Sequence, residues 1–266
     1  MSDSGLLLAG ITHRFADSGW QLSVDRFSVG RQTLTGIIGP NGSGKSTLLR
    51  IAAGVMAPVA GDVCLGGKPL AKMERRGVAR QLGYLPQEVA SLFDYSVEDV
   101  VRMGRYPHAS AFGSLGAGDL KVVERCLSRA ELLEMRKRPL SHLSGGERKR
   151  ALLASVLAQE PETLLLDEPT AALDLHHQVR FFQLIHALAQ SGMGIAVVTH
   201  DLNLAALFCD RVLLMDAGRF VADGTPVEVL QRDRLKSVYG PEVLLSTHPE
   251  TQGPLVLPRL AKGGDT

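Results

Sequence analysis

The sequence predicts an α/β protein in which a mostly parallel sheet is covered by helices on both faces. After Pro161, short apolar runs that suit buried strands alternate with longer segments of helical spacing. Earlier in the chain, a strand pattern leads through a glycine-rich turn directly into a helix pattern. The alternating segments after Pro161 are strands at 163–166, 194–199, 212–215 and 219–222, and helices at 175–190 and 202–209.

The part of the chain before residue 86 is predicted to be rich in strands. Turn residues at 17–19 and 30–31 separate its first three apolar runs, and a helix at 46–53 that ends near Gly54 follows the third run. Because a phosphate binds well where a strand gives way to a helix, the junction before residue 46 is the first place to look for chemistry. The expected strands lie at 6–15, 20–24, 33–38, 61–65 and 82–85.

Between residue 96 and about residue 160 the pattern becomes helical, with helices expected at 120–133 and 147–159 after a first helix that begins near Ser96. This stretch is predicted to be a helical insert within the α/β body. A last helix is expected at 226–237, and residues 246–266 are expected to form a loosely packed tail. The sequence contains no internal repeat, so one copy of the functional unit is expected.

Charge and composition argue against a nucleic-acid-binding protein. The 266 residues include 29 Lys and Arg against 28 Asp and Glu, for a formal charge of +1, and 45% of the residues are hydrophobic. Such a chain lacks the strong basic footprint that phosphate backbones require. Basic runs occur at 74–76, 136–138 and 148–150, and we interpret them as solvated helix faces that at most contact a partner.

The three cysteines, at 64, 126 and 209, are widely spaced and odd in number. This pattern is typical of a reducing compartment, and we expect all three to be small buried hydrophobes. No apolar run approaches the roughly 18 residues that a membrane-spanning helix needs, and no leader pattern precedes the first strand. If the protein serves a membrane, we expect it to do so from the side.

The strand-to-helix junction carries a phosphate-loop pattern, in which a glycine is followed by four residues and then by Gly-Lys-Ser. Glycines allow backbone N–H groups to converge on a phosphate, the helix offers its positive end, the lysine reaches the β and γ phosphates, and the serine hydroxyl can ligate Mg²⁺. The expected nucleotide-binding residues are Gly39, Asn41, Gly42, Ser43, Gly44, Lys45, Ser46 and Thr47.

Two adjacent carboxylates, Asp167 and Glu168, end the apolar strand at 163–166. An acid pair in a loop is usually a solvated turn. Behind a phosphate loop on a parallel sheet, however, the first acid typically holds Mg²⁺ and the second polarises the water that attacks the γ phosphate. We therefore expect Asp167 to be associated with the metal and Glu168 to be the general base.

A second phosphate-binding pattern, Leu143-Ser144-Gly145-Gly146-Glu147, opens the helix expected at 147–159. Its Ser144 hydroxyl and the N–H groups of Gly145 and Gly146 lie at another positive helix end. In isolation, these residues also fit a simple helix cap. Two such surfaces far apart in one chain make most sense if the phosphate loop of one copy faces the second pattern of another copy, giving two shared sites across a two-fold axis.

The order of motifs along the chain resembles the ATP-binding-cassette (ABC) family from about residue 5 to 245. In that order come the phosphate loop, Tyr84-Leu85-Pro86-Gln87, the Ser144 signature, the Asp167-Glu168 strand, Ala172-Leu173-Asp174 and Val198-Thr199-His200-Asp201. The resemblance implies a phosphate-loop (RecA-like) ABC nucleotide-binding domain at 1–245, with an N-terminal antiparallel β subdomain. It also implies a helical subdomain at about 89–160, which leaves 246–266 as a C-terminal tail.

The resemblance also implies roles for single residues. Gln87 would couple the nucleotide site to the membrane partner and help to hold the metal, Asp174 would act across the dimer, and His200 would be the switch histidine beside the γ phosphate. Together with Lys45 and Glu168, the residues Gln87 and His200 form the expected catalytic set. Phe15 stands where the family usually stacks a tyrosine on adenine. A core role for Phe15, or stacking by the nearby Trp20, remains open.

The chain also resembles the ATPases of bacterial importers for iron–siderophore, haem and cobalamin. This resemblance lies in the stretches 96–108, 173–178 and 200–206. Siderophore is the first choice of cargo, ahead of haem and cobalamin. Adjacent His176 and His177 would point about 100° apart on a helix and bind one ion poorly, so we interpret them as surface or dimer contacts. The alternative, a DNA-repair or translation-related ABC ATPase, would need a long coiled coil or a second cassette, and an exporter would usually carry a fused membrane domain.

The mechanism implied by the resemblance is that ATP with Mg²⁺ joins two copies of the chain into a closed homodimer, which moves integral membrane permease subunits before hydrolysis resets the pair. A substrate-binding protein would take part indirectly, and nucleic acid would not. The expected location is peripheral, on the cytoplasmic face of the inner membrane.

Overall fold

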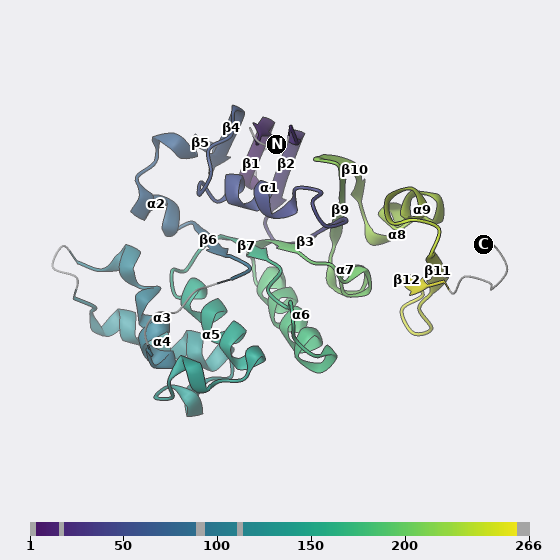
Figure 1. Ribbon diagram of the computed structural model, residues 1–266. Coiled ribbons are helices and arrows are strands. Elements are labelled where there is room, and N and C mark those ends of the chain that lie inside the picture. The colour runs from purple at the N-terminus through teal and green to yellow at the C-terminus, as the bar shows by residue number, and fades with distance from the viewer. Residues whose placement is uncertain (1–3, 16–18, 89–93, 111–113, 260–266) are drawn as a thin grey trace.

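A six-stranded sheet lies at the centre of the computed structural model, which describes residues 4–15, 19–88, 94–110 and 114–259 (Figure 1). The strand order is β10-β9-β3-β8-β7-β6, and every pair is parallel except β9 with β10. The predicted α/β class is confirmed. The strands are β3 (Thr33–Ile38), β6 (Leu82–Leu85), β7 (Thr163–Asp167), β8 (Gly194–Val198), β9 (Arg211–Asp216) and β10 (Arg219–Gly224).

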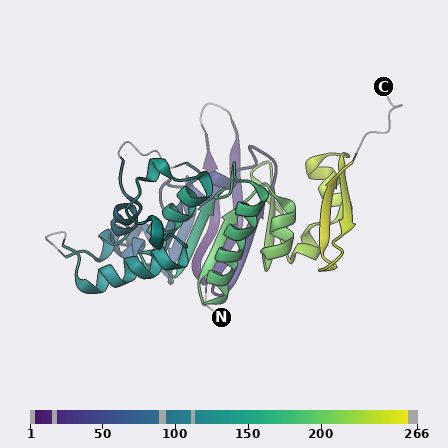
Figure 2. The ribbon, with the colours of Figure 1, turned by 90° about the horizontal axis from the view of Figure 1, so that it is seen from below.

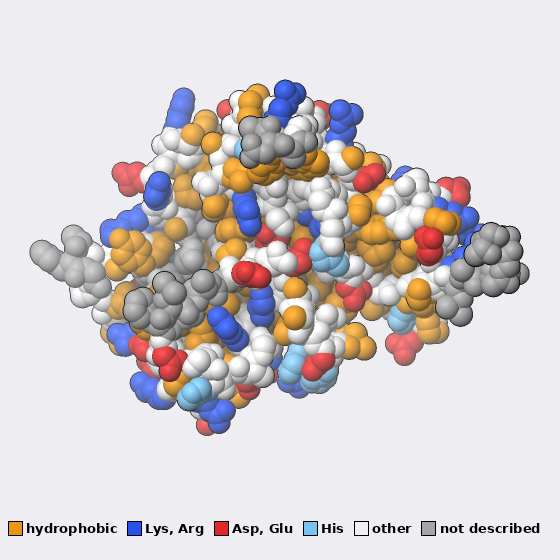
Figure 3. Space-filling model, viewed as in Figure 1, with side chains coloured by type: hydrophobic (Ala, Val, Ile, Leu, Met, Phe, Trp, Pro, Cys, Tyr) orange, Lys and Arg blue, Asp and Glu red, His pale blue; other side chains and the backbone are white. Residues whose placement is uncertain are grey.

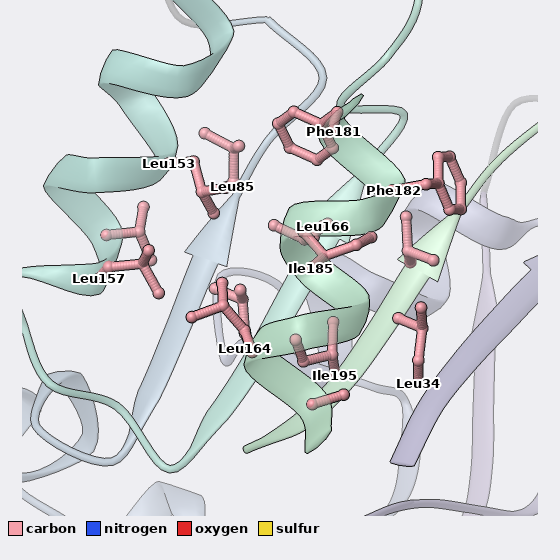
Figure 4. Close-up of a cluster of buried hydrophobic side chains, with 14 of the residues drawn as sticks. Leu34, Leu85, Leu153, Leu157, Leu164, Leu166, Phe181, Phe182, Ile185 and Ile195 are labelled. Carbon is pink, nitrogen blue, oxygen red and sulfur yellow. The ribbon is translucent and has the colours of Figure 1, made fainter. Parts of the chain in front are cut away.

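Both faces of this sheet are buried, because successive side chains of a strand point to opposite faces. In β7, Leu164 and Leu166 face one hydrophobic cluster, which includes Phe182 of helix α6 (Leu175–Gln190). Figure 4 shows these side chains between the strands and α6. Leu165 faces a second cluster that includes Leu48 of helix α1 (Lys45–Ala52). Packing on both faces holds the carboxyl ends of β3 and β7 in fixed positions at one edge.

A separate antiparallel sheet, in the order β2-β1-β4-β5, covers the α1 side of the molecule. The second predicted strand, 20–24, is too short, because β2 continues to Gly30. Exposed Asp25 and Arg26 interrupt its alternation of buried and exposed residues, so the sequence pattern looked finished there. The strands are β1 (Ser4–Arg14), β2 (Gln21–Gly30), β4 (Ala60–Leu65) and β5 (Lys68–Pro69).

Helices fill the stretch between β6 and β7 and lie to one side of the central sheet (Figures 1 and 2). They pack closely, because a Cβ on Gly104 would lie 1.9 Å from the Ser155 carbonyl oxygen. The helix expected at 120–133 lies earlier, since Glu131 adopts a positive φ of 56° that no helix continues through. A subdomain boundary near residues 89 and 160 stays a prediction. The helices are α3 (Val97–Met103), α4 (Ala117–Arg129) and α5 (Gly145–Leu157), after α2 (Arg75–Ala79).

The C-terminal segment differs from two expectations. The single helix at 226–237 is two helices, α8 (Pro226–Val229) and α9 (Arg232–Tyr239), because buried Leu230 leaves helical geometry between them. The prediction of a loosely packed tail at 246–266 is wrong for the part of this range that the structure describes. There, β11 (Val243–Thr247) and β12 (Pro254–Pro258) form a hairpin, seen in yellow in Figure 2.

That hairpin is held by helix α7 (Leu202–Phe208), the helix that follows β8. The Asn203 side-chain amide donates to the Val256 carbonyl at 3.1 Å, and the Val256 N–H donates back to Asn203 Oδ1 at 2.8 Å. A side-chain amide therefore pairs with strand β12 as a neighbouring strand would. Sequence patterns do not show such a contact, because its two partners are far apart along the chain.

Two smaller points concern the cysteines and the membrane. Cys126 and Cys209 are buried as expected, whereas Cys64 is only partly buried, so the expectation is wrong for that residue. It lies on β4, a strand whose first residues are exposed. Within the described residues, no helix is long and apolar enough to cross a membrane.

Candidate functional site

The loop between β3 and α1 is shaped by its glycines. Gly39 has a φ of 148°, and a Cβ there would lie 2.1 Å from the Met215 carbonyl oxygen. Gly44 has a φ of 103°, and a Cβ there would lie 2.8 Å from the Trp20 ring. Any side chain at either position would collide with a neighbour or strain the backbone. The glycines therefore shape a tight turn that leads directly into the start of α1, where a phosphate can bind.

The Lys45 side chain bonds to backbone carbonyls of this loop. Its side chain is 4% exposed, and its Nζ donates to the carbonyls of Gly39 at 2.9 Å and Pro40 at 2.8 Å. Burial lowers the pKa of Lys45, while the charges of Glu168 and Asp167 act against that shift. The ammonium is thus held beside the loop and close to two carboxylates.

Two serines flank Lys45 with different surroundings. Ser46 Oγ donates to Asp167 Oδ1 at 2.8 Å, and Asp167 is 1% exposed. Burial raises the pKa of Asp167, and the Ser46 hydrogen bond opposes that change. Ser43 Oγ is also buried, yet it has no hydrogen-bond partner in the described part of the chain. An unsatisfied hydroxyl inside a glycine loop is the kind of group that a bound phosphate oxygen satisfies.

Glu168 follows Asp167 in a left-handed conformation, with a φ of 47°. Its Oε2 accepts a hydrogen bond from Gln87 Nε2 at 2.8 Å, and its Oε1 lies 2.5 Å from His200 Nε2. The three residues come from the ends of three neighbouring strands, β6, β7 and β8. The carboxylate of Glu168 is therefore held at both oxygens, and the structure brings the predicted acid, glutamine and histidine together.

A cavity of about 440 Å³ lies over the glycine loop. Phe15 and Trp20 flank it with their ring centroids 5.8 Å apart, so both aromatics that the sequence suggested are at hand. A second cavity of about 300 Å³ shares Glu168 and contains His200. In Figure 3, acidic, basic and histidine side chains gather at the centre of this face. The first cavity is lined by Phe15, Trp20, Asn41, Gly42, Gly44, Lys45, Ser46, Thr47 and Glu168.

The second predicted phosphate-binding surface lies at the start of α5, where Ser144 and Glu147 cap each other. Ser144 N donates to Glu147 Oε2 at 2.8 Å, and Glu147 N donates to Ser144 Oγ at 3.3 Å. Hydrogen bonds to the Glu147 carboxylate from the Ser144 backbone, first, and from the Ser144 side chain lower the pKa of Glu147. Ser144 and Gly145 are exposed, and of the residues that the structure describes, none of 143–147 lines the glycine-loop cavity. Ser144 and Glu147 thus form the helix cap that the sequence allowed, and Ser144 and Gly145 also present an exposed surface.

Asp174 is the N-cap residue immediately before helix α6, beside this second surface. Its Oδ1 accepts a hydrogen bond from the His177 N–H at 2.9 Å, so it caps the helix. The His177 ring packs on Gly146, where an added Cβ would lie 2.9 Å from it. The rings of His176 and His177 lie 5.6 Å apart, and the described residues contain no group of three or more potential metal ligands. Asp174 lies outside the cavity over the glycine loop.

Two contacts of the basic run at 148–150 escaped the sequence reasoning. The basic run 148–150 was interpreted as a solvated helix face, but Lys149 Nζ donates to the Gln87 carbonyl oxygen at 2.7 Å. Arg150 Nε also donates to the Ala130 carbonyl, at 3.1 Å. No sequence signal could have found these contacts, because they depend on how α5 packs beside the end of β6.

Comparison with known proteins places this site in context. Residues 22–171 match the family model described as ABC transporter. The hemin import ATP-binding protein HmuV of Pseudomonas putida is 45% identical over 231 residues, which cover 85% of this chain and 89% of that protein. The iron(3+)-hydroxamate import ATP-binding protein FhuC of Bacillus subtilis is 39% identical, with 86% of each chain covered. Both relatives carry import in their names.

Among solved structures, a metal-chelate type ABC transporter in an inward-facing conformation superposes with a TM-score of 0.84. It is 27% identical to this chain, and the match covers 97% of this chain and 98% of that one.

Proposed function

The chain belongs to the ABC transporter family, and we propose that it is the ATP-hydrolysing subunit of a bacterial importer that works as a homodimer. The observation that carries this proposal is the separation of two phosphate-binding surfaces in one chain. The glycine-loop cavity contains Lys45 and Glu168, whereas exposed Ser144 lies on another helix and outside that cavity. Two copies related by a two-fold axis would complete each cavity with the signature of the other copy.

The glycine loop is suited to hold the phosphates of ATP. Backbone N–H groups and the start of α1 attract the negative charge, Lys45 would exchange its loop carbonyls for phosphate oxygens, and Ser43 Oγ would gain the partner that it lacks. Phe15 and Trp20 flank the cavity and offer faces on which adenine can stack. The other phosphate contacts would come from Gly39, Asn41, Gly42, Gly44, Ser46 and Thr47, with Ser144, Gly145, Gly146 and Asp174 supplied by the partner copy.

The oxygens beside the loop fit a magnesium ion. Ser46 Oγ and buried Asp167 Oδ1 lie 2.8 Å apart, and hard oxygen atoms are the ligands that Mg²⁺ prefers. Ser46, Asp167 and the Gln87 side chain would hold Mg²⁺ directly or through water. The ion would supply positive charge to the β and γ phosphates.

The chemical step then depends on Glu168. Its carboxylate accepts a proton from water as the water oxygen bonds to the γ phosphorus, and the bond to the bridging β–γ oxygen breaks to release ADP and phosphate. Gln87 and His200 each hold one oxygen of Glu168, which orients the base. His200 also lies where its ring can donate to the γ phosphate as charge develops.

ATP binding would drive transport by favouring the closed dimer over the open one. The closed pair would re-orient two integral membrane permease subunits, and a substrate-binding protein would deliver cargo on the far side. In this assembly the chain would lie on the cytoplasmic face of the inner membrane as a peripheral subunit. The import functions in the names of the relatives support this proposal over a DNA-repair or translation role.

The cargo would be a metal chelate of the siderophore, haem or cobalamin kind. The sequence favoured siderophore, whereas identity is higher to the hemin relative, at 45%, than to the hydroxamate relative, at 39%, which favours haem. ATP hydrolysis by the chain reconstituted with its permease and binding protein would settle the choice. We expect haem to stimulate it more than a ferric hydroxamate does, and the reverse result would contradict the haem assignment.

The proposal is tested by ATP hydrolysis as a function of protein concentration. The rate per chain should rise with concentration, because each site needs two copies. Glu168→Gln should lower the rate by roughly 10²- to 10⁴-fold, while ATP-dependent dimers accumulate on size exclusion. The exposed Glu124→Gln is the matched control and should hydrolyse normally. A rate per chain independent of concentration from a persistent monomer would refute the shared sites.

A further inference from the structure

Lys149 joins two parts of the chain that the proposed function assigns to different ATP sites. It lies on α5, the helix that begins with the capped signature residues Ser144 and Glu147. Its Nζ donates to the carbonyl oxygen of Gln87 at 2.7 Å, and the side chain of Gln87 donates to Glu168 at 2.8 Å. One side chain thus connects the signature helix to the residue that holds the general base.

We propose that Lys149 is a positioning residue that couples the two ATP sites of the homodimer by tying the signature helix of each copy to Gln87 of the same copy. This inference rests on the proposed function, since it requires that the signature serve the ATP of the partner copy. Lys149 belongs to the basic run at 148–150, for which the sequence analysis predicted no function beyond a possible contact with a partner.

The position of Lys149 is electrostatically specific. Burial lowers its pKa, and the neighbouring Arg148 acts in the same direction, whereas Glu88, Glu168 and Asp167 oppose the change. The ammonium group is only partly buried, and the charges of both catalytic-site carboxylates of its own copy act on it.

The contact also has a geometric consequence. Gln87 follows β6, a strand of the central sheet, while Lys149 belongs to the helical stretch beside it. Movement of α5 relative to β6 would break the Lys149 contact or pull on the Gln87 backbone. Gln87 also holds Glu168 through its side chain, so ATP that shifts the Gln87 backbone in one site would change the position of the signature that faces the other ATP.

The test is the dependence of the steady-state rate on ATP for purified wild type, Lys149→Met, Lys149→Arg and Lys121→Met. Lys149→Met keeps the length of the side chain and removes its charge and donor. Lys149→Arg keeps both. Lys121, an exposed lysine of α4, provides the matched control outside the site. Binding of a fluorescent ATP analogue to dilute monomer measures the single half-site separately.

We expect a Hill coefficient of about 2 for wild type and for Lys121→Met, and of about 1 for Lys149→Met. The reason is that coupling between the sites is a free energy, which the Lys149 contact supplies. The maximal rate should fall roughly tenfold, as for the loss of one charge-assisted hydrogen bond, while analogue binding to monomer stays within about twofold. Lys149→Arg should restore cooperativity.

Two results would overturn the inference alone. One is a cooperative Lys149→Met protein. The other is a Lys149→Met protein whose loss of rate follows a lowered melting temperature and weakened monomer binding, which would mean a merely structural role. A wild-type protein without cooperativity or concentration dependence would instead remove the proposed function, and the inference with it.

Discussion

The two phosphate-binding surfaces of this chain are built in opposite ways. The glycine loop is packed from within, with Lys45 4% exposed and Asp167 1% exposed, and its polar groups bond mainly to one another. In the signature at the start of α5, Ser144 and Glu147 bond to each other as a helix cap, and Ser144 and Gly145 are exposed. A surface held by internal partners is complete in one chain, whereas a capped but exposed helix start requires something outside the chain.

The largest effect is expected from removing the ammonium group of Lys45 from the packed glycine loop. Lys45→Ala should weaken ATP binding to the monomer on the order of a hundredfold, because the charge-assisted contacts of its ammonium with phosphate are lost. Titration with a fluorescent ATP analogue measures this. Lys72→Ala, at the end of a short exposed turn, is the control and should bind normally. Unchanged affinity in Lys45→Ala would mean that the glycine loop does not hold the phosphates.

The exposed surface predicts a smaller effect of a different kind. Ser144→Arg should leave ATP binding to monomer intact and lower hydrolysis roughly tenfold to a hundredfold, because the partner's phosphates lose their second set of donors. Ser96→Arg is a matched control, since Ser96 caps α3 by the same hydrogen bond to the backbone three residues on. Equal losses in both variants would assign the effect to helix capping alone.

The same two variants allow a complementation test. A mixture of Lys45→Ala and Ser144→Arg chains contains heterodimers in which one site keeps both an intact loop and an intact signature. Hydrolysis should therefore recover in the mixture above the sum of the separate rates. If mixing restored nothing, the two surfaces would not meet between copies.

The smallest expected effect concerns the stability of the region that carries the signature. Arg136, and secondarily Lys137, hydrogen-bond Glu98 at the start of α3 and lower the pKa of that carboxyl from 4.5 to about 2. Because the pKa is lower in the folded state, this stabilisation is present above about pH 4.5 and is lost as the pH falls toward 2. Glu98→Gln should thus reduce the free energy of unfolding by about 2 kcal/mol at neutral pH.

Chemical denaturation of wild type and Glu98→Gln at several pH values measures this difference. The gap between the two proteins should be full near neutrality, narrow below about pH 4.5 and close as the pH approaches 2. The exposed Glu134→Gln should show no such gap. A constant gap at all pH values would mean that packing, and not the charge of Glu98, is responsible.

Much of the site follows from local sequence because its parts are contiguous. The glycine loop needs positive φ at Gly39 and Gly44 and a lysine at the helix start, and those requirements fall within eight adjacent positions. The Asp167–Glu168 pair likewise follows a run of apolar residues that fits only a buried strand. For the same reason, the predicted ends of the central strands lie within a few residues of their ends in the structure, as do those of the helices that cover the sheet.

Other features failed because their causes are distant in sequence. The C-terminal hairpin was expected to be loose, yet Asn203 holds Val256 by two hydrogen bonds. Lys149 was placed on a solvated face, yet it donates to Gln87. In both cases a polar residue of ordinary appearance finds a backbone partner more than fifty positions away, and no local pattern encodes that pairing.

The sequence by itself determined the fold class, the phosphate loop, the acid pair and the signature, because each depends on backbone conformation or periodicity within a few residues. Only the tertiary structure decided that Gln87 and His200 meet on Glu168, that Phe15 and Trp20 share one cavity, and that the signature lies outside the lining of that cavity. These are facts about distance between strand ends and helix starts. Distance is set by the packing of the whole sheet, to which every buried side chain contributes.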